Sequence, residues 1–430
     1  MRHRALVSRF GSPLYIYQLA EADAALADLR SMLPAPATVC YSLKANPHPA
    51  IAARLAHGGC HAEVSSCGEL EAALEAGFDP PSEIIYTGPA KTPREISFAL
   101  SRGVRRFSAE SIADLRRIGA GARTAGTVAQ CLIRVSCTDG ARGGIHMHAG
   151  PSARFGVPLD TLVSSVEEFK AISGVEIVGA HFFPVSNAER EEDLLAEFRT
   201  SISAAQQLRA AGLPMAVLDL GGGFPAAWGK RGERVVARGQ AAELATLLDS
   251  SVPGWRNGQP AIAFESGRYL SAHCGVLVST VTEVKHHNGR TFLLLDSGIN
   301  HLGGMTALGR MLRTRLEPRL EPPHGARRSD AGPVTLVGPL CTPADLHGVD
   351  IELPEAETGD LVVFPAAGAY GLTASLIGFL SRPLPAEVVL DGDRVASATR
   401  LRLERHNATL PEPWSPLEEQ RDLDKCRSDC

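Results

Sequence analysis

The chain has 430 residues, of which 44% are hydrophobic and 21% are charged. This length exceeds a single small module and suits an α/β barrel of roughly 250 residues with a second domain, and the composition excludes wholesale disorder. The net charge is −5 and the basic residues are scattered, so we expect neither nucleic acid nor a membrane as a partner. The opening residues lack a secretory signal pattern, and no apolar run approaches about 18 residues. We therefore expect a cytoplasmic protein.

One strand-like run, PLYIY, precedes a long series of alternating strands and helices. Eight β-rich runs cover residues 38–45, 61–66, 83–88, 105–110, 131–136, 176–183, 215–223 and 261–267. Ser66 with Glu69, and Thr92 with Glu95, have the spacing of capping boxes at the starts of two intervening helices. Alternation of this kind predicts parallel strands. Eight units without a large interruption predict a closed, TIM-like (β/α)8 barrel rather than an open sheet.

After residue 275 the pattern changes to strands joined by tight turns. Runs at 276–285 and 290–297 flank Asn288-Gly289, a later run contains Asp391-Gly392, and both pairs favour hairpins. Further β-rich runs lie at 333–339 and 360–366. We predict a barrel over 36–275, a β-rich domain formed by 1–35 together with 276–405, and a flexible tail over 406–430.

Active sites of such barrels lie at the carboxyl ends of the strands, so the last residues of each run are informative. These are Lys44 after the first run, His181, Phe183 and Ser186 at the sixth, Gly221, Gly222 and Gly223 at the seventh, and Glu265, Gly267 and Arg268 at the eighth. A glycine run beside a second Gly-Arg pair favours a phosphate site, because N–H groups without side chains can encircle the phosphate oxygens. For the glycine run alone, the alternative is a plain tight turn.

Lys44 follows a strand of apolar and small residues, which places its amine at the barrel mouth. Partial desolvation there would help the amine to lose its proton and form a Schiff base with an aldehyde; the alternative is a surface ion pair. A lysine, a phosphate cup and a carboxylate such as Glu265 facing a pyridine nitrogen are what pyridoxal 5'-phosphate requires, and we predict this cofactor. The histidine pairs at 146 and 148 and at 286 and 287 lack a third ligand, so no metal is predicted.

Five motifs, in order along the chain, resemble one enzyme family. They are Tyr41-Ser42-Leu43-Lys44-Ala45-Asn46, the glycine run, Glu265-Ser266-Gly267-Arg268, the stretch GPLCTPAD at 338–345, and Gly368-Ala369-Tyr370. From about residue 12 to residue 390, the chain resembles the fold-type III, pyridoxal-phosphate-dependent amino-acid decarboxylases, which include diaminopimelate and ornithine decarboxylases. The resemblance implies an alanine racemase-type barrel with a β domain, and α-decarboxylation as the reaction.

The resemblance also implies roles for individual residues. It makes Lys44 the Schiff-base lysine, Glu265 the partner of the pyridine nitrogen, Cys341 the proton donor and Asp345 a substrate-binding neighbour of Cys341. Residues expected to surround the cofactor are His181, Phe183, Ser186, Gly221, Gly222, Gly223, Gly267, Arg268 and Tyr370. In the family, the proton-donor loop comes from the second subunit, so a homodimer with shared active sites is implied, and a monomer should be inactive.

Three departures from the family pattern concern the cofactor and the substrate. Phe183 stands where family members commonly carry a histidine that stacks on the cofactor, and Ser266 replaces a proline. Asp296-Ser297-Gly298-Ile299-Asn300-His301 is followed by LGGMTALGRML rather than the Arg-Pro-x-Leu-Tyr run of diaminopimelate decarboxylases. A substrate with a distal charged end therefore loses its expected clamp.

The stretches GPLCTPADL and GAYGLTASLIGFLSRPLPAEV resemble a branch of the family found in secondary-metabolite pathways. Some members of that branch decarboxylate an aminoacyl group tethered to an acyl carrier protein, which is a possible partner here. The alternative is a free diamino acid of the ornithine, lysine or diaminopimelate type. Two further alternatives are an amino-acid racemase of the same fold and a non-catalytic homologue, but the presence of Lys44 and Cys341 disfavours the latter.

Overall fold

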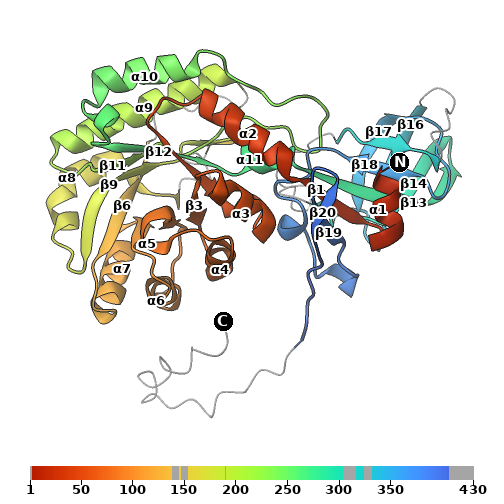
Figure 1. The fold of residues 1–430 in the computed structure, drawn as a ribbon, viewed down its shortest axis with the longest axis horizontal. Helices are drawn as coiled ribbons and strands as arrows, with labels where there is room; N and C mark the ends of the chain where they lie inside the picture. Colours follow the sequence, from red (N-terminus) through yellow and green to blue (C-terminus); the bar gives the residue numbers. More distant parts are fainter. Residues whose placement is uncertain are drawn as a thin grey trace, which may run out of the picture.

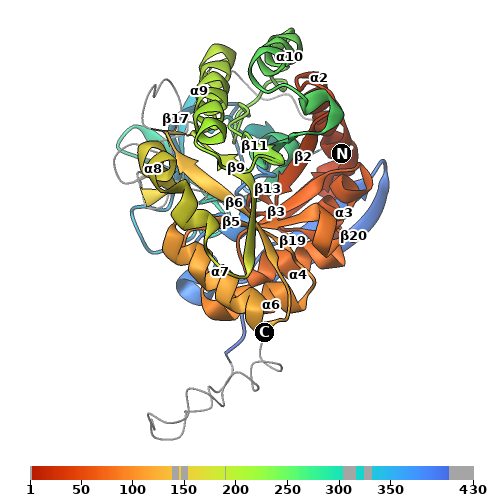
Figure 2. The same ribbon diagram turned by 90° about the vertical axis from the view of Figure 1, so that its left-hand side faces the viewer.

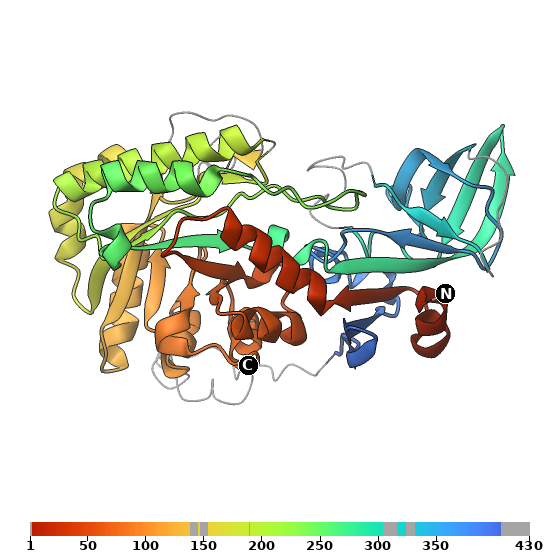
Figure 3. The same ribbon diagram turned by 45° about the horizontal axis from the view of Figure 1, so that its top comes forward.

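The computed structural model describes residues 2–137, 145–146, 154–188, 190–303, 316–323 and 332–405. The chain forms a closed barrel surrounded by helices, and beside it a second, β-rich part (Figures 1 and 3). Residue His148 and the predicted tail lie outside the described residues. Within the described part, no helix has the length and apolar character needed to cross a bilayer.

Eight parallel strands form the barrel, and each corresponds to one of the predicted runs. They are β2 (Thr38–Ser42), β3 (His61–Val64), β4 (Ile84–Tyr86), β5 (Arg106–Ala109), β6 (Ala129–Ser136), β9 (Val175–Phe182), β11 (Val217–Asp219) and β12 (Ala261–Ser266). Pairing of β12 with β2, and of β5 with β6, closes the ring. The predicted (β/α)8 barrel is therefore confirmed, and Figure 2 shows its strands at the centre of a ring of helices.

The helices of this ring alternate with the strands. They are α2 (Leu19–Ser31), α3 (Pro49–His57), α4 (Cys67–Glu75), α5 (Pro80–Glu83), α6 (Pro93–Ser101), α7 (Ile112–Thr124), α8 (Leu159–Lys170), α9 (Glu191–Ala210), α10 (Gln240–Ser251) and α11 (Arg268–Ser271). The capping box of Thr92 and Glu95 forms at the start of α6. At α4, Ser66 caps the Glu69 N–H, but the Glu69 carboxylate accepts from Ser65 N–H instead of completing the box.

The second part is a largely antiparallel sheet that includes the first strand of the chain. Its strands are β1 (Leu14–Gln18), β13 (Gly275–His287), β14 (Arg290–Leu295), β15 (Arg319–Glu321), β16 (Gly332–Val337), β17 (Leu346–Leu353), β18 (Leu361–Phe364), β19 (Ala386–Asp391) and β20 (Arg394–Thr399). β1 lies between β13 and β19, which confirms that the N-terminal strand joins this sheet. The exact domain limits stay a prediction.

The two predicted hairpins are present in this sheet. Asn288 and Gly289, with φ of 49° and 73°, connect β13 to β14, and the turn after Asp391 connects β19 to β20. Both turn residues of the first hairpin adopt the left-handed backbone that Asn-Gly accommodates most easily. The first helix, α1 (Arg2–Phe10), and the strands β15 and β17 were not predicted from the sequence. The short strands β7 (Ile145–His146), β8 (Val157–Pro158) and β10 (Val185–Ser186) complete the structure.

Backbone hydrogen bonds attach the segment before Tyr370 to the barrel mouth. Tyr370 N–H donates to Ala45 O at 2.7 Å, and the Asn46 side-chain amide donates to Gly368 O at 2.8 Å. The loop after β11 joins the same segment, because Trp228 Nε1–H donates to Ala369 O at 2.7 Å. The second part of the molecule therefore contributes directly to the surroundings of Lys44.

Candidate active site

A cavity lies at the carboxyl ends of the barrel strands, and we call it the mouth cavity. Eight of the predicted site residues line it: Lys44, Phe183, Ser186, Gly223, Glu265, Gly267, Arg268 and Tyr370. Gly221, Gly222 and His181 adjoin these residues along β9 and β11. The rule that barrel sites form at the strand ends thus brings together residues from Lys44 to Arg268, and Tyr370 joins them from the second part of the molecule.

Lys44 lies in a short 3-10 turn, Leu43–Ala45, directly after β2. Its Nζ is 2.9 Å from Glu63 Oε2, and its side chain is 38% exposed, compared with 2% for Glu63. Burial alone would lower the pKa of Lys44, but the negative charges of Glu63 and Glu265 outweigh burial and raise it. The expectation of a readily deprotonated lysine is therefore wrong for this structure, in which Lys44 is held as an ammonium.

Glu63 was not among the predicted site residues, although it lies near the end of the second barrel strand. Burial would raise its pKa, but the Lys44 ammonium and the hydroxyl of Thr87 lower it to about 2. Ser65 Oγ also donates to Glu63 Oε1, at 3.2 Å. Glu63 is thus an anion held by Lys44, Thr87 and Ser65. It lies in the middle of the predicted run 61–66, so a reading of the last residues of each run did not identify it.

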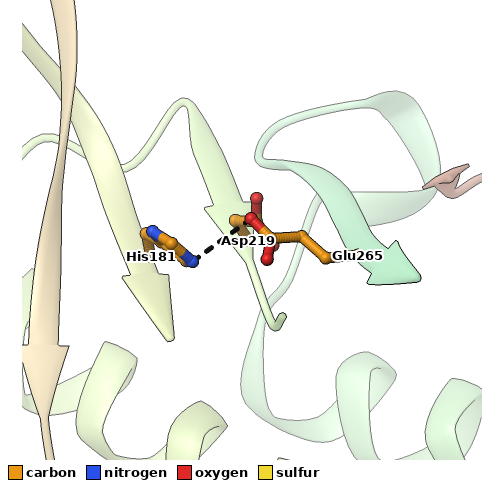
Figure 4. A group of neighbouring side chains, drawn as sticks. All are labelled: His181, Asp219 and Glu265. Atoms are coloured by element: carbon orange, nitrogen blue, oxygen red, sulfur yellow. Dashed lines mark ion pairs between the residues drawn. The ribbon is translucent and has the colours of Figure 1, made fainter. Parts of the chain in front are cut away.

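His181, Asp219 and Glu265 form a buried cluster beneath the mouth cavity. Figure 4 shows the three side chains directed toward one another from β9, β11 and β12. Their nearest nitrogen and oxygen atoms all lie within 4.8 Å of one another, and His181 Nε2 is 3.3 Å from Glu265 Oε1. Neither of these two atoms has a hydrogen-bond partner among the described residues. The cluster therefore has free polar capacity next to the cavity.

The charges in this cluster are reduced by burial. Burial, followed by the negative charges of Glu63 and Asp219, raises the pKa of Glu265 well above its usual range. Burial and the Arg134 guanidinium lower the pKa of His181, whose Nδ1 lies 2.7 Å from Ser108 Oγ. Since both groups tend to be neutral, the cluster has little charge with which to hold a cation. We assign it to the cofactor site, and the prediction of no metal stays a prediction.

The glycine run after β11 packs too closely for any side chain. A Cβ at Gly221 would lie 2.1 Å from Phe182 O, one at Gly222 would lie 2.3 Å from Glu265 O, and one at Gly223 would lie 2.8 Å from Val185 O. Gly221 N–H donates to Asp219 Oδ1 at 2.9 Å. Within the described chain, the N–H groups of Gly222 and Gly223 have no acceptor, which leaves them available for phosphate oxygens.

Arg268 and Tyr370 stand beside this glycine run. The Arg268 guanidinium carbon lies 4.7 Å from the centre of the Tyr370 ring. Burial lowers the pKa of Arg268, and no carboxylate pairs with it in the part of the chain that the structure describes. A guanidinium without a counter-ion next to free N–H groups fits a phosphate monoester.

Phe183 forms an apolar wall of the mouth cavity between two cations. Lys44 Nζ lies 5.4 Å and the Arg134 guanidinium carbon 5.9 Å from the centre of its ring. Arg134 is paired with Glu110 at 2.8 Å. The phenyl ring offers a flat surface for a pyridine ring without contributing a titratable group.

Cys341 and Asp345 do not line the mouth cavity as described. Cys341 is exposed on the loop after β16. Asp345 is buried, and its carboxylate accepts from Ile299 N–H at 2.8 Å and from Leu340 N–H at 2.6 Å. With both oxygens engaged, Asp345 joins two loops, and this geometry does not support the predicted substrate contact. Thr342, beside Cys341, is partly exposed.

Comparisons with known proteins agree with this site. The sequence model described as "Pyridoxal-dependent decarboxylase, pyridoxal binding domain" matches residues 19–272. The chain is 29% identical to "L-glutamyl-[BtrI acyl-carrier protein] decarboxylase" of Niallia circulans over 90% of each chain. It is also 29% identical to "Diaminopimelate decarboxylase" of Pseudomonas aeruginosa, over 92% of this chain and 91% of the relative.

A solved structure shares the whole architecture. A point mutant of diaminopimelate decarboxylase from Helicobacter pylori, complexed with L-lysine, superposes with a TM-score of 0.80 at 26% identity, covering 93% of this chain and 96% of that one. Barrel, second sheet and site define a pyridoxal-phosphate-dependent decarboxylase. The chain belongs to the pyridoxal-dependent decarboxylase family, and its cofactor is pyridoxal 5'-phosphate.

Proposed function

We propose that this decarboxylase removes the α-carboxyl group of an aminoacyl substrate whose side-chain carboxyl is linked to a carrier protein, in a biosynthetic pathway. The similarity over 90% of both chains to a decarboxylase of a carrier-bound glutamyl group carries this proposal. The neutral Thr342 beside Cys341, and the missing Arg-Pro-x-Leu-Tyr run, support it because neither offers an ionic clamp for a charged distal end.

The residues of the mouth cavity fit the cofactor. The free N–H groups of Gly222 and Gly223 and the Arg268 guanidinium suit its phosphate. Glu265, whose Oε1 has no hydrogen-bond partner among the described residues, suits its ring nitrogen. When bound, the cofactor supplies an electrophilic aldehyde and a ring that accepts the electron pair left by departing CO2. Phe183 would lie against the face of the cofactor ring, and Lys44 would supply the amine that reacts with the aldehyde.

The ion pair of Lys44 and Glu63 determines when the Lys44 ammonium can lose its proton. The ammonium of Lys44 must lose a proton before its nitrogen can attack the aldehyde. Glu63 holds the ammonium in place at 2.9 Å, and its negative charge favours the protonated form of Lys44. Glu63 therefore positions Lys44, and its own low pKa keeps it from removing the proton permanently. The same contact returns Lys44 to its resting position after product release.

Cys341 supplies a proton to Cα after the carboxyl group has left. Because Cys341 is exposed and outside the mouth cavity of its own chain, we propose a homodimer in which this loop of one copy faces the mouth of the other. Four exposed apolar side chains on the same part of the molecule support self-association: Leu346, Leu376, Phe379 and Leu380. Each active site is then shared, and a single copy is incomplete.

Two alternatives concern the substrate and the reaction. A free diamino acid is the second candidate substrate, since the chain is also 29% identical to a diaminopimelate decarboxylase. Racemisation is less favoured, because it needs the carboxylate to stay and a base on each face of Cα, and the relatives that match are decarboxylases.

A panel of substrates tests the proposal. The cofactor-loaded enzyme is incubated with glutamyl and other aminoacyl carrier proteins, and separately with free glutamate, ornithine, lysine and diaminopimelate, and products are weighed for the loss of CO2. We expect turnover of a carrier-bound substrate at least tenfold above every free amino acid. Preferred turnover of a free diamino acid would overturn the carrier proposal, and α-hydrogen exchange without CO2 release would indicate a racemase.

A further inference from the structure

Two cavities, at opposite ends of the barrel, are each lined by one member of a neighbouring pair of carboxyl groups. Glu265 lines the mouth cavity. A second cavity, the floor cavity, lies at the amino ends of the strands and is lined by Thr38, His61, Arg106, Asp219 and Ala261, among others. Asp219 and Glu265 are each only 1% exposed. The two carboxyl groups therefore separate the cofactor side of the barrel from its floor.

The two groups are close enough for their charges to repel each other strongly. Their nearest oxygen atoms lie within 4.8 Å, with His181 completing the cluster (Figure 4). Asp219 Oδ1 accepts from Gly221 N–H at 2.9 Å, whereas Glu265 Oε1 has no hydrogen-bond partner in the described part of the chain. Two buried carboxyl groups at this separation cannot both ionise without strong repulsion, so the pair retains a proton.

The neighbouring charges leave this repulsion in place. Glu63 adds a third negative charge, which is paired with Lys44. Of the cations that face the pair, Arg134 is paired with Glu110, and Arg106 lies on the floor side. Burial, and after it the neighbouring negative charges, raise the pKa of both Glu265 and Asp219. His181, whose pKa is lowered, adds no positive charge, and Cys40 is a neutral neighbour.

We propose that Asp219 is a positioning residue that retains a proton on Glu265, so that this proton can be shared with the ring nitrogen of the cofactor. As the nitrogen arrives, the O–H bond of Glu265 breaks, an N–H bond forms, and the electron pair stays on the Glu265 carboxylate. Asp219 lines the floor cavity and Glu265 the mouth cavity, so the charge of Asp219 acts on Glu265 from the side opposite the cofactor. This inference rests on the proposed placement of the ring nitrogen at Glu265.

The variant Asp219→Asn tests the charge without removing the acceptor, because its amide oxygen can still accept from Gly221 N–H. In the cofactor-loaded protein, the absorbance change that reports loss of the ring proton at high pH should move to lower pH by about one unit, a tenfold loss of proton affinity. An unchanged midpoint would overturn the proposal. The control is Asp249→Asn, at an exposed ion pair with Arg256, which should leave the midpoint unchanged.

A cofactor analogue with CH in place of the ring nitrogen separates the proton effect from a structural one. The affinity of Asp219→Asn for this analogue should match that of the wild type at every pH. Asp219→Ala removes both the charge and the acceptor for Gly221. An effect seen in Asp219→Ala but not in Asp219→Asn would assign Asp219 a purely structural role and overturn the proposal.

The wild-type protein gives the same test if the variants do not fold. Raising the pH from 7 to 10 should weaken binding of pyridoxal phosphate at least tenfold more than binding of the analogue, because only the former shares a proton with Glu265. Parallel pH profiles would overturn the proposal. Failure of the wild type to decarboxylate any substrate would instead count against the proposed function. The binding profiles would still decide whether a proton is shared between Glu265 and the ring nitrogen.

Discussion

The barrel mouth and the loop after β16 differ in how complete they are within one chain. At the mouth, Lys44, Glu63, Glu265 and Arg268 already stand in a defined electrostatic arrangement. On the loop, Cys341 is exposed, while Asp345 is fully engaged by backbone N–H groups. In the homodimer proposed above, cofactor binding is built into each copy of the protein, whereas proton delivery to the product requires a second copy.

Substitution of Lys44, at the barrel mouth, should have the largest effect on turnover. Lys44→Ala removes the amine that meets the aldehyde, so we expect loss of the visible absorbance of the lysine-bound cofactor and a fall in turnover of roughly 1000-fold or more. Absorbance spectra and CO2 release measure the two effects. If both the absorbance and the CO2 release are retained, Lys44 is not the lysine that binds the cofactor.

Substitution of Cys341 should separate the two regions. Cys341→Ala leaves every residue of the mouth cavity in place, so cofactor affinity should be unchanged, while turnover falls by about 100-fold or more through loss of the general acid. Wild-type kinetics in this variant would contradict the role of Cys341.

A mixture of the two inactive variants tests whether the sites are shared. In a dimer with one Lys44→Ala and one Cys341→Ala copy, one of the two sites contains both native groups. Random pairing should therefore restore about one quarter of wild-type activity. No recovery after subunit exchange, confirmed by mass measurement, would show that each copy works alone.

Asp345 and Thr342 should differ in what they affect, although they lie on one loop. Asp345→Ala leaves the buried N–H groups of Ile299 and Leu340 without an acceptor, which should lower the free energy of unfolding by roughly 2–4 kcal/mol. Thr342→Ala should change stability by about 0.5 kcal/mol or less but alter KM for the substrate. Denaturation curves and kinetics would reveal the reverse pattern if Asp345 contacts substrate.

Glu63 should make a smaller, pH-dependent contribution to stability. Its pKa of about 2 lies below the ordinary value of 4.5, so its ionised form stabilises the fold above pH 4.5, and this contribution is lost as pH falls toward 2. Glu63→Gln should lower the free energy of unfolding at pH 7 by roughly 2 kcal/mol, allowing for the partly exposed Lys44. Urea denaturation at pH 7 and pH 3 should give a smaller difference at pH 3.

Much of the fold was predictable because the barrel strands are short β-rich runs separated by capped helices. Thr92 and Glu95 show this at the level of single contacts. Strand β17, LHGVDIEL, was missed although its second half alternates between apolar and polar residues, because Gly348 interrupts the pattern and shortens the alternating run to five residues. Helix α1 has no fully buried residue, and only Leu6, Val7 and Phe10 pack against the second sheet, so its apolar face was too short to be noticed in the sequence.

The site was predictable only where the position along a strand decides the environment. That reasoning found Lys44 and Glu265, but the ionisation of Lys44 depends on Glu63, which lies on the next strand and is 19 positions away in sequence. Likewise, the resemblance to a family places Asp345 near Cys341, but it does not reveal that backbone N–H groups occupy both carboxylate oxygens. Partners of this kind become visible only in three dimensions.

The place of β1 between β13 and β19 has a consequence for how the protein is made. Residues 38–266, which contain all eight barrel strands, are contiguous and can close as soon as they leave the ribosome. Residues 14–18, although synthesised first, have no neighbouring strand until residues 275–278 and then 386–390 have followed. The earliest strand to be synthesised is therefore among the last to be ordered, and chains that stop short of residue 386 would leave one of its edges open to pairing with other chains.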